Sequence, residues 1–309
     1  MGKKLLVAVD DSMPSTQAAM YAARVSLFAE GMTCTLFFVE PVIPETLAEE
    51  AKTDAKTEAD VNRLGRLNAE SAKRILNNHK ELMCREGVPE SHIETIAQTK
   101  QAGVTRDILN LARQGLYDAI LMGHGDIMRS RDFFMGTTAA KVLEHSLDIP
   151  VWVVDEETTS TKVVAAVDGS DNSLRAVDHI ISMVGNNPSV KLTLFHVRPH
   201  LRHYYSIAFE EKEPALQDAL HRGDKRRIER FYEEAFKRLT LAGLKESQIE
   251  IKTNTRAYHI STAILDEARS GLYGTVVIGR RGERQAFFMG SVAMRLVQKI
   301  SGLALWVVP

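Results

Sequence analysis

Short apolar runs alternate with longer segments of helical periodicity along the whole chain. In the first half the apolar runs occupy residues 4–9, 34–39, 93–98, 119–122 and 151–154. A short, nearly continuous apolar run is typical of a parallel strand that is covered on both faces. The stripes between the runs, such as residues 16–28, predict helices. This alternation predicts an α/β domain with a five-stranded parallel sheet of the doubly wound, Rossmann-like kind and helices on both faces.

The order of elements repeats in the second half of the chain. Its apolar runs occupy residues 163–167, 192–197, 249–253, 275–278 and 305–308. Matching residues recur at similar spacing in the two halves, since Asp10 corresponds to Asp168 and Trp152 corresponds to Trp306. The polar segment DEETTS at residues 155–160 separates the two copies. The sequence therefore predicts two tandem domains of one fold, residues 1–155 and 156–309.

Composition and charge narrow the class of protein. Of the 309 residues, 44% are hydrophobic and 26% are charged, which is typical of a folded globular chain. The formal net charge of −1 gives no general attraction to nucleic acid, and the basic run at residues 222–230 has the pattern of a solvated helix face. No apolar stretch approaches the ~18 residues of a membrane span, and the N-terminal run is too short for a signal peptide. We expect a cytoplasmic protein with neither a nucleic-acid nor a membrane partner.

Cysteines and histidines give no metal-site pattern. Cys34 and Cys84 are the only cysteines, too few for a disulfide framework or a cysteine zinc site. His200 and His203 stand three residues apart and could share a metal on a helical turn, but no cysteine or carboxylate completes an evident ligand set. A surface or interface segment is the favoured interpretation of these histidines, and no metal site is predicted.

Two related loops carry the candidate chemistry. Residues 276–291 (VVIGRRGERQAFFMGS) pass from a strand through a glycine-bearing loop to a helix start, and residues 120–137 (ILMGHGDIMRSRDFFMGT) echo them. Backbone N–H groups in such loops and at helix N-termini attract anions. Ligands of doubly wound sheets bind where the strand order reverses, so Asp168 should meet Gly279 there, and Asp10 should meet Gly123. Neither loop is a Walker A or a G-x-G-x-x-G sequence, which excludes P-loop phosphoryl transfer and hydride transfer.

Several of these segments together resemble the universal stress protein family in its tandem form. They are VAVDDS at 7–12, AAVDGSDNS at 165–173, His196-Val197, the two glycine loops, and the closing PVWVV and ALWVV. Nucleotide-binding members of that family carry G-x2-G-x9-G-[ST], whose backbone and final hydroxyl hold the phosphates of ATP. The resemblance implies ATP or a related adenine nucleotide as the ligand, with or without Mg²⁺.

The resemblance also implies which residues contact the nucleotide. In the second domain they are Asp168, Val197, Gly279, Gly282, Gly290, Ser291 and Val292, with Arg280 and Arg281 adding charge on the phosphate side. In the first domain the corresponding positions are Asp10, Val39, Gly123, Gly136, Thr137 and Thr138. Neither loop fits the family pattern fully, because the second is two residues short and the first places Asp126 where the second glycine belongs. A carboxylate there would repel a triphosphate, so the nucleotide is expected chiefly in the second domain.

By this resemblance the chain is a stress-response protein that acts as a ligand-dependent regulator. One alternative is an interaction or assembly module in which neither domain binds nucleotide, and a weaker one is a slow ATP-hydrolysing enzyme. No general base or arginine finger is evident, so rapid turnover is not expected. Single-domain members of the family dimerise through their closing strands, and in a fused chain residues 151–154 are expected to pair with residues 305–308. Whether the whole chain forms a homodimer stays open.

Overall fold

The computed structural model describes residues 2–29, 31–125, 138–156, 160–185, 187–203, 213–281 and 289–309. The strands of the first half are β1 (Lys4–Ala8), β2 (Thr33–Glu40), β3 (Ile93–Thr99), β4 (Ala119–Gly123) and β5 (Val151–Val154). Those of the second half are β6 (Lys162–Val167), β7 (Lys191–Val197), β8 (Ile249–Asn254), β9 (Thr275–Gly279) and β10 (Ala304–Val308). Each half therefore contributes the five strands that its apolar runs predict.

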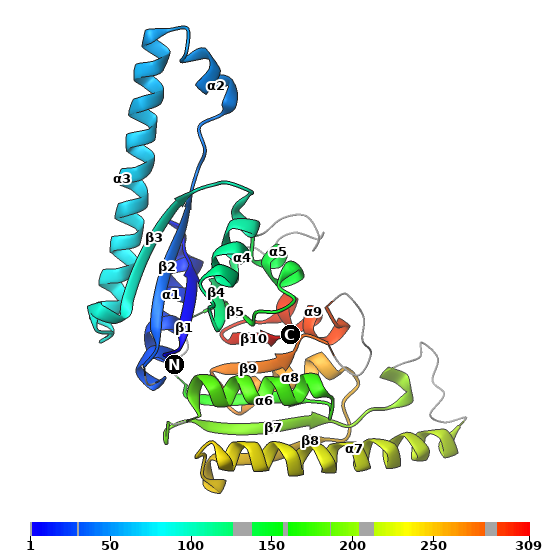
Figure 1. The fold of residues 1–309 in the computed structure, drawn as a ribbon. Helices are drawn as coiled ribbons and strands as arrows, with labels where there is room; N and C mark the ends of the chain where they lie inside the picture. The colour runs from blue at the N-terminus through cyan, green and yellow to red at the C-terminus, as the bar shows by residue number, and fades with distance from the viewer. Residues whose placement is uncertain are drawn as a thin grey trace.

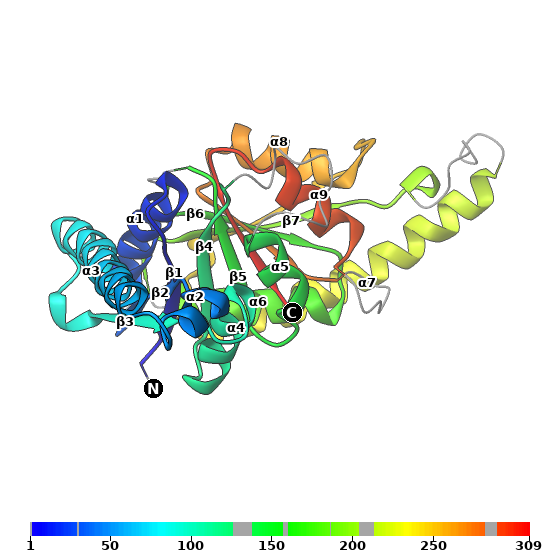
Figure 2. The same ribbon diagram turned by 90° about the horizontal axis from the view of Figure 1, so that it is seen from above.

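The helices of the first half are α1 (Met13–Phe28), α2 (Glu45–Glu50), α3 (Ala55–Arg85), α4 (Val104–Gln114) and α5 (Thr138–His145). Those of the second half are α6 (Asp171–Val184), α7 (Pro214–Leu241), α8 (Ile260–Ser270) and α9 (Ser291–Lys299). Short 3-10 turns, η1 (Glu90–His92), η3 (Leu201–His203) and η4 (Glu246–Gln248), join some of the elements. The long helices α3 and α7 lie at opposite ends of the molecule (Figures 1 and 2).

The strands form one ten-stranded sheet in the order β3-β2-β1-β4-β5-β10-β9-β6-β7-β8. Within each half all neighbouring strands are parallel. One hydrophobic core packs α1, α3, α6 and α7 against one face of the sheet, and a second packs α4, α5, α8 and α9 against the other. The two halves are thus doubly wound α/β units that share a continuous sheet.

The closing strands join the two halves in the middle of the sheet. β5 and β10 pair antiparallel with Trp152 opposite Trp306, which confirms the predicted intramolecular pairing of the closing strands. The two indoles stack with ring centroids 3.9 Å apart and an interplanar angle of 3°. Trp152 Nε1 donates to His179 Nε2 in α6, and Trp306 Nε1 donates to Tyr21 Oη in α1, both at 2.9 Å. Each tryptophan therefore bonds a helix of the opposite domain.

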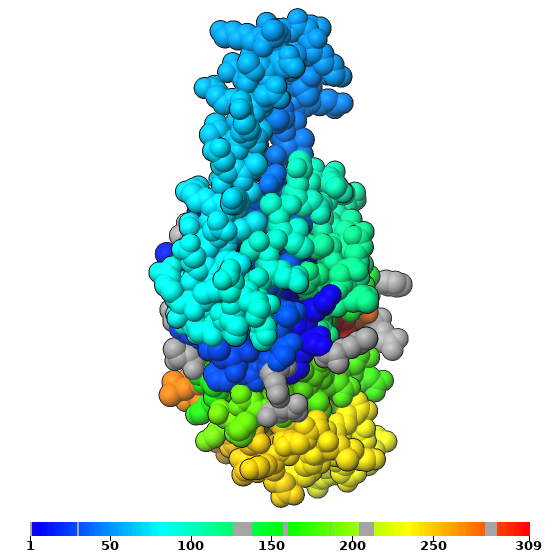
Figure 3. Space-filling view, turned by 60° about the vertical axis from the view of Figure 1, so that its left-hand side comes forward, coloured from blue at the N-terminus to red at the C-terminus, as the bar shows by residue number. Residues whose placement is uncertain are grey.

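A narrow arm made by α2 and the front of α3 projects from the body of the molecule (Figure 3). The buried residues of α3 begin only at Ala72, and α2 has none. The front of α3 is instead fixed locally, because the Asp54 carboxylate accepts from the backbone N–H of Thr57 at 2.8 Å as an N-cap. Within the described residues, no helix combines the length and apolarity that a membrane crossing requires.

Candidate nucleotide-binding site

The strand order of the second half reverses between β6 and β9. β6 pairs with β7 on one side and with β9 on the other, while the helices that follow β6 and β9 cover opposite faces of the sheet. Such a reversal opens a crevice at the carboxyl ends of the strands. Asp168 directly follows β6, and Gly279 ends the adjacent β9. The structure thus brings Asp168 and Gly279 to one edge, as the sequence predicts.

The carboxylate of Asp168 organises the turn that leads into α6. Its Oδ1 accepts from the backbone N–H of Ser170 at 3.0 Å and from the hydroxyl of Ser173 at 2.8 Å. The Ser173 hydroxyl in turn accepts from the backbone N–H of Asp168 at 3.0 Å. Among the described residues, Asp168 Oδ2 has no hydrogen-bond partner. One carboxylate oxygen therefore holds the turn, and the other can accept from a ligand.

The first domain builds the same turn around Asp10. Its Oδ1 accepts from the Ser12 backbone N–H at 3.1 Å, from the Ser15 hydroxyl at 2.6 Å, and from the Ser12 hydroxyl. The acidic residue after the first strand therefore does not distinguish the domains.

The glycines that end β4 and β9 have a packing reason in this structure. A Cβ on Gly279 would lie 2.9 Å from Asn172 Cβ, in the first turn of α6. A Cβ on Gly123 would lie 2.4 Å from the backbone carbonyl carbon and oxygen of Pro14, in the first turn of α1. Only a residue without a side chain lets these helix starts approach the strand ends so closely.

The N-terminus of α9 offers backbone donors beside the crevice. Its N-cap is Gly290, which has no side chain to cap the helix, and Ser291 at the first helical position is exposed. The backbone N–H groups of Ser291 and Val292 have no hydrogen-bond partner among the described residues. Free N–H groups and the positive end of the helix dipole together favour an anion there.

The other residues that were predicted to contact the nucleotide either lie outside the described part of the chain or occupy varied positions in the fold. Gly282, Gly136, Thr137 and the unfavourable Asp126 lie outside the described residues. Thr138 is the first residue of α5, Val39 is half-buried near the end of β2, and Val197 is buried at the end of β7. Arg281 is half-buried, and its backbone carbonyl accepts from Asn172 Nδ2 at 2.9 Å.

Arg280 does not face the predicted phosphate side. Its side chain is 3% exposed, and its guanidinium donates to the backbone carbonyls of Leu143, Glu144 and Ser146 at the end of α5. A cation at a helix C-terminus pairs with free carbonyls and with the negative end of the dipole. Arg280 therefore joins the two domains, which corrects its predicted role as a source of charge for the nucleotide.

His124 makes the reciprocal contact from the first domain. It follows Gly123 as Arg280 follows Gly279, and its Nε2 lies 2.6 Å from the backbone carbonyl oxygen of Val297 in α9. Its Nδ1 lies 3.2 Å from Asp155 Oδ1. In each domain, the residue after the first glycine of the loop thus contacts the helix that follows the loop of the other domain: Arg280 contacts the end of α5, and His124 contacts the last turn of α9.

A buried polar group beside the site escaped the sequence pattern. His196 Nδ1 lies 2.9 Å from the backbone oxygen of Val167, and its Nε2 lies 2.9 Å from Asp224 Oδ2. Asp224 Oδ1 accepts from Arg227 at 3.2 Å, and the Arg227 stem packs where a Cβ on Gly169 would come within 2.9 Å. The basic run at residues 222–230 is therefore not only a solvated face, because Asp224, one of its two acidic residues, is buried and fastens α7 to the site's turn.

The His200 segment uses its ring nitrogens for backbone contacts. His200 Nε2 lies 2.9 Å from the Thr255 carbonyl oxygen, and His203 Nε2 lies 3.0 Å from that of Ala257. A third imidazole, His221, lies beside them with its ring centroid 5.3 Å from that of His200. In the part of the chain that the structure describes, no three His, Cys, Asp or Glu side chains are grouped to hold a metal ion.

The fold defines a tandem protein of the doubly wound α/β class, with one candidate ligand site at the carboxyl ends of the strands of each half. Because β5 and β10 are antiparallel, the two sites lie at opposite edges of the shared sheet. A family model described as the universal stress protein family matches residues 1–155 and again residues 159–308. The chain therefore belongs to the universal stress protein family. No curated protein matches the chain significantly.

Solved structures support the tandem fold. A universal stress protein from Archaeoglobus fulgidus is 16% identical with a TM-score of 0.62, and the match covers 99% of this chain and 97% of that one. A Pseudomonas aeruginosa protein assigned to the same family is 14% identical with a TM-score of 0.55, and the match covers 99% of this chain and 92% of that one. Likeness at these identities shows the fold alone. A universal stress protein solved in complex with cAMP is 17% identical with a TM-score of 0.38 over 50% of this chain and 98% of its own, too weak a likeness to indicate this chain's ligand.

Proposed function

We propose that this protein binds ATP, or a related adenine nucleotide, in the crevice of its second domain and acts as a ligand-dependent regulator. The observation that carries the proposal is the pairing of two features at the strand-order reversal. Asp168 keeps one carboxylate oxygen without a partner among the described residues, and α9 begins with a glycine cap and open backbone donors. A ribose hydroxyl donates to the first, and phosphate oxygens accept from the second.

The proposed contacts are fewer than the sequence implies. We infer that the nucleotide contacts Asp168, Val197, Gly279 and the start of α9 at Gly290, Ser291 and Val292. Arg280 is left out because its guanidinium is bonded to α5. Mg²⁺, where it accompanies the nucleotide, would be held through the phosphate oxygens together with water. In this proposal the nucleotide is a signal and is not turned over rapidly.

A matched pair of isosteric variants tests the site. Asp168→Asn keeps Oδ1 as an acceptor for Ser170 and Ser173 but replaces the other oxygen with an amide donor. Asp10→Asn makes the same change in the equivalent turn of the first domain. Loss of one charge-assisted hydrogen bond should weaken ATP binding about tenfold or more in Asp168→Asn, with little change in Asp10→Asn. Isothermal titration of the full chain with ATP and Mg²⁺ measures both.

The titration also distinguishes the proposed function from the two alternatives, an interaction module and an enzyme. Equal weakening by the two variants, or weakening by Asp10→Asn alone, would refute the assignment to the second domain. No heat of binding in the parent protein would favour an interaction module that binds no nucleotide. Release of phosphate over many turnovers would favour an enzyme. Gly290→Val and Ser291→Ala test the helix start in the same assay, and both should weaken binding.

A further inference from the structure

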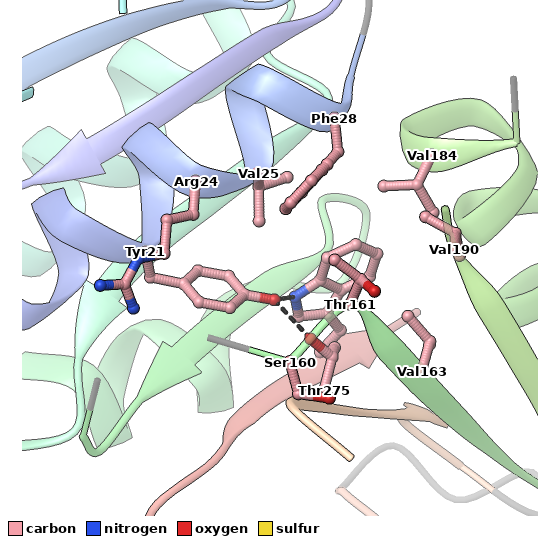
Figure 4. Close-up of a pocket in the computed structure, with 11 residues that line it drawn as sticks. Tyr21, Arg24, Val25, Phe28, Ser160, Thr161, Val163, Val184, Val190 and Thr275 are labelled. Carbon is pink, nitrogen blue, oxygen red and sulfur yellow. Dashed lines mark hydrogen bonds between the residues drawn. The ribbon is translucent and has the colours of Figure 1, made fainter. Parts of the chain in front are cut away.

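A cavity of about 240 Å³ lies between the two domains. Its walls come from α1 of the first domain and from β6, the end of α6, β9 and β10 of the second (Figure 4). None of its lining residues belongs to the proposed nucleotide site. Its apolar lining is formed by Val25, Phe28, Val163, Val184, Val190 and Trp306.

A chain of three polar groups lies against this apolar lining. Trp306 Nε1 donates to Tyr21 Oη at 2.9 Å, and Tyr21 Oη lies 2.7 Å from Thr275 Oγ1. Figure 4 shows the Tyr21 ring reaching across from α1, with dashed lines from its hydroxyl to the indole nitrogen and to Thr275. The indole N–H can only donate, so Tyr21 Oη is its acceptor.

Counting protons leaves one donor without an acceptor. The hydroxyls of Tyr21 and Thr275 share a single hydrogen bond, which takes one of their two protons. Burial raises the pKa of Tyr21, so the phenol keeps its proton. Neither hydroxyl has a further partner among the described residues. Whichever of the two donates to the other, one hydroxyl proton of the pair remains unpaired.

The position of this donor makes it unusual. Tyr21 is 4% exposed and Thr275 is 5% exposed, and buried polar groups are nearly always hydrogen-bonded. The equivalent place on the other side of the interface is built differently. There Ala119 takes the position of Thr275 next to the first strand, and His179 Nε2 accepts directly from Trp152. The pair of hydroxyls is therefore specific to the side that contains the cavity.

The volume of the cavity and the charges around it limit which ligands it can hold. Apolar cavities of ~150 Å³ hold benzene, so this cavity has room for one ring with a substituent. Arg24 also lines it, but Arg24 Nε lies 4.0 Å from Glu86 Oε2, so its charge is already balanced. A buried carboxylate would thus lack a dedicated cation, and a neutral molecule is favoured.

We propose that this cavity binds a small neutral molecule with an apolar, ring-sized body and one acceptor oxygen, which accepts the unpaired proton of the Tyr21–Thr275 pair. The same site couples ligand occupancy to the domain interface, because Trp306 both lines the cavity and stacks on Trp152. The proposal does not depend on nucleotide binding.

Two probes of nearly equal shape test the proposal on the full chain in the absence of ATP. Cyclohexanone carries an acceptor oxygen, and methylenecyclohexane has a CH₂ group in its place. Binding is followed by tryptophan fluorescence, since Trp152 and Trp306 are the only tryptophans, and by saturation-transfer NMR of the probes. The ketone should bind about fivefold more tightly than the hydrocarbon. Trp152→Phe keeps Trp306 as the sole reporter and should retain the signal.

Variants of the polar chain locate the contact. Thr275→Val removes one hydroxyl but leaves the Tyr21 proton without an acceptor, so this variant should retain the preference for the ketone. The triple variant Tyr21→Phe/Thr275→Val/Trp306→Phe removes every donor of the chain and keeps Trp152 as the reporter, so it should bind the two probes with equal affinity. Thermal melts establish that each variant is folded, and the two probes are compared within one variant, so a general loss of stability does not imitate the result. Equal affinity of the two probes in the parent, binding of neither at millimolar concentration, loss of the ketone preference in Thr275→Val, or a ketone preference that survives in the triple variant would each overturn the proposal.

Discussion

Replacing Arg280 with methionine tests how strongly the two domains hold each other. The guanidinium is buried and donates to three backbone carbonyls at the end of α5. Leaving a buried acceptor without its donor costs about 1–3 kcal/mol, so the gross loss is at least about 3 kcal/mol. Burial also lowers the pKa of Arg280, which shows that the charge itself is unfavourably desolvated, and methionine removes that cost. We expect a net loss of about 2 kcal/mol in the free energy of unfolding.

Urea unfolding measures this loss through the fluorescence of the two interface tryptophans. The matched control is Arg295→Met, which changes an exposed arginine in α9. The urea concentration at the unfolding midpoint should fall clearly in Arg280→Met. In the control, the free energy of unfolding should change by less than about 0.5 kcal/mol. If both variants unfold alike, or if Arg280→Met matches the parent, the helix-capping contact does not stabilise the interface and this reasoning is wrong.

Two further predictions follow from buried titratable groups. Burial lowers the pKa of His179 to about 3, below its ordinary 6.5, so the unfolded chain binds the extra proton and stability is lost as the pH falls from 6.5 towards 3. His179→Gln keeps an acceptor for Trp152 but does not titrate. Between pH 6 and 4, urea denaturation should show the free energy of unfolding of the parent falling by up to about 1.4 kcal/mol per pH unit relative to the variant. If the free energies of the two proteins change with pH in parallel, this prediction is wrong. Burial raises the pKa of Cys34 to about 12, so a thiol reagent should modify the half-buried Cys84 first and reach Cys34 only on unfolding. Simultaneous modification of both in the native protein would contradict the buried position of Cys34.

The internal repeat and the pattern of apolar runs were sufficient to predict most of the fold from the sequence. Apolar runs at equivalent places predicted five strands per half, and the resemblance to the universal stress protein family implied the β5–β10 pairing that the structure shows. These inferences succeed because a strand buried on both faces has few polar positions, and because an unpaired apolar edge needs a partner.

The sequence could not predict contacts that depend on how the two domains meet. Arg280 follows a loop glycine, which suggests a phosphate ligand, yet its partners lie about half the chain away at the end of α5. The Tyr21 hydroxyl likewise meets Thr275 and Trp306 only because α1 packs on the tryptophan of the other domain. Nothing in local spacing encodes such pairs. The loop glycines were expected to serve a ligand, and the close approach of Pro14 and Asn172 gives them a packing reason as well.

The number of nucleotides per chain tests the central proposal most directly. Native mass spectrometry of the purified full chain with ATP and Mg²⁺ resolves zero, one and two bound nucleotides. The account predicts one ATP per chain, retained in Asp10→Asn and lost or strongly reduced in Asp168→Asn. Two nucleotides per chain, none at all, or one that survives in Asp168→Asn but disappears in Asp10→Asn would contradict it.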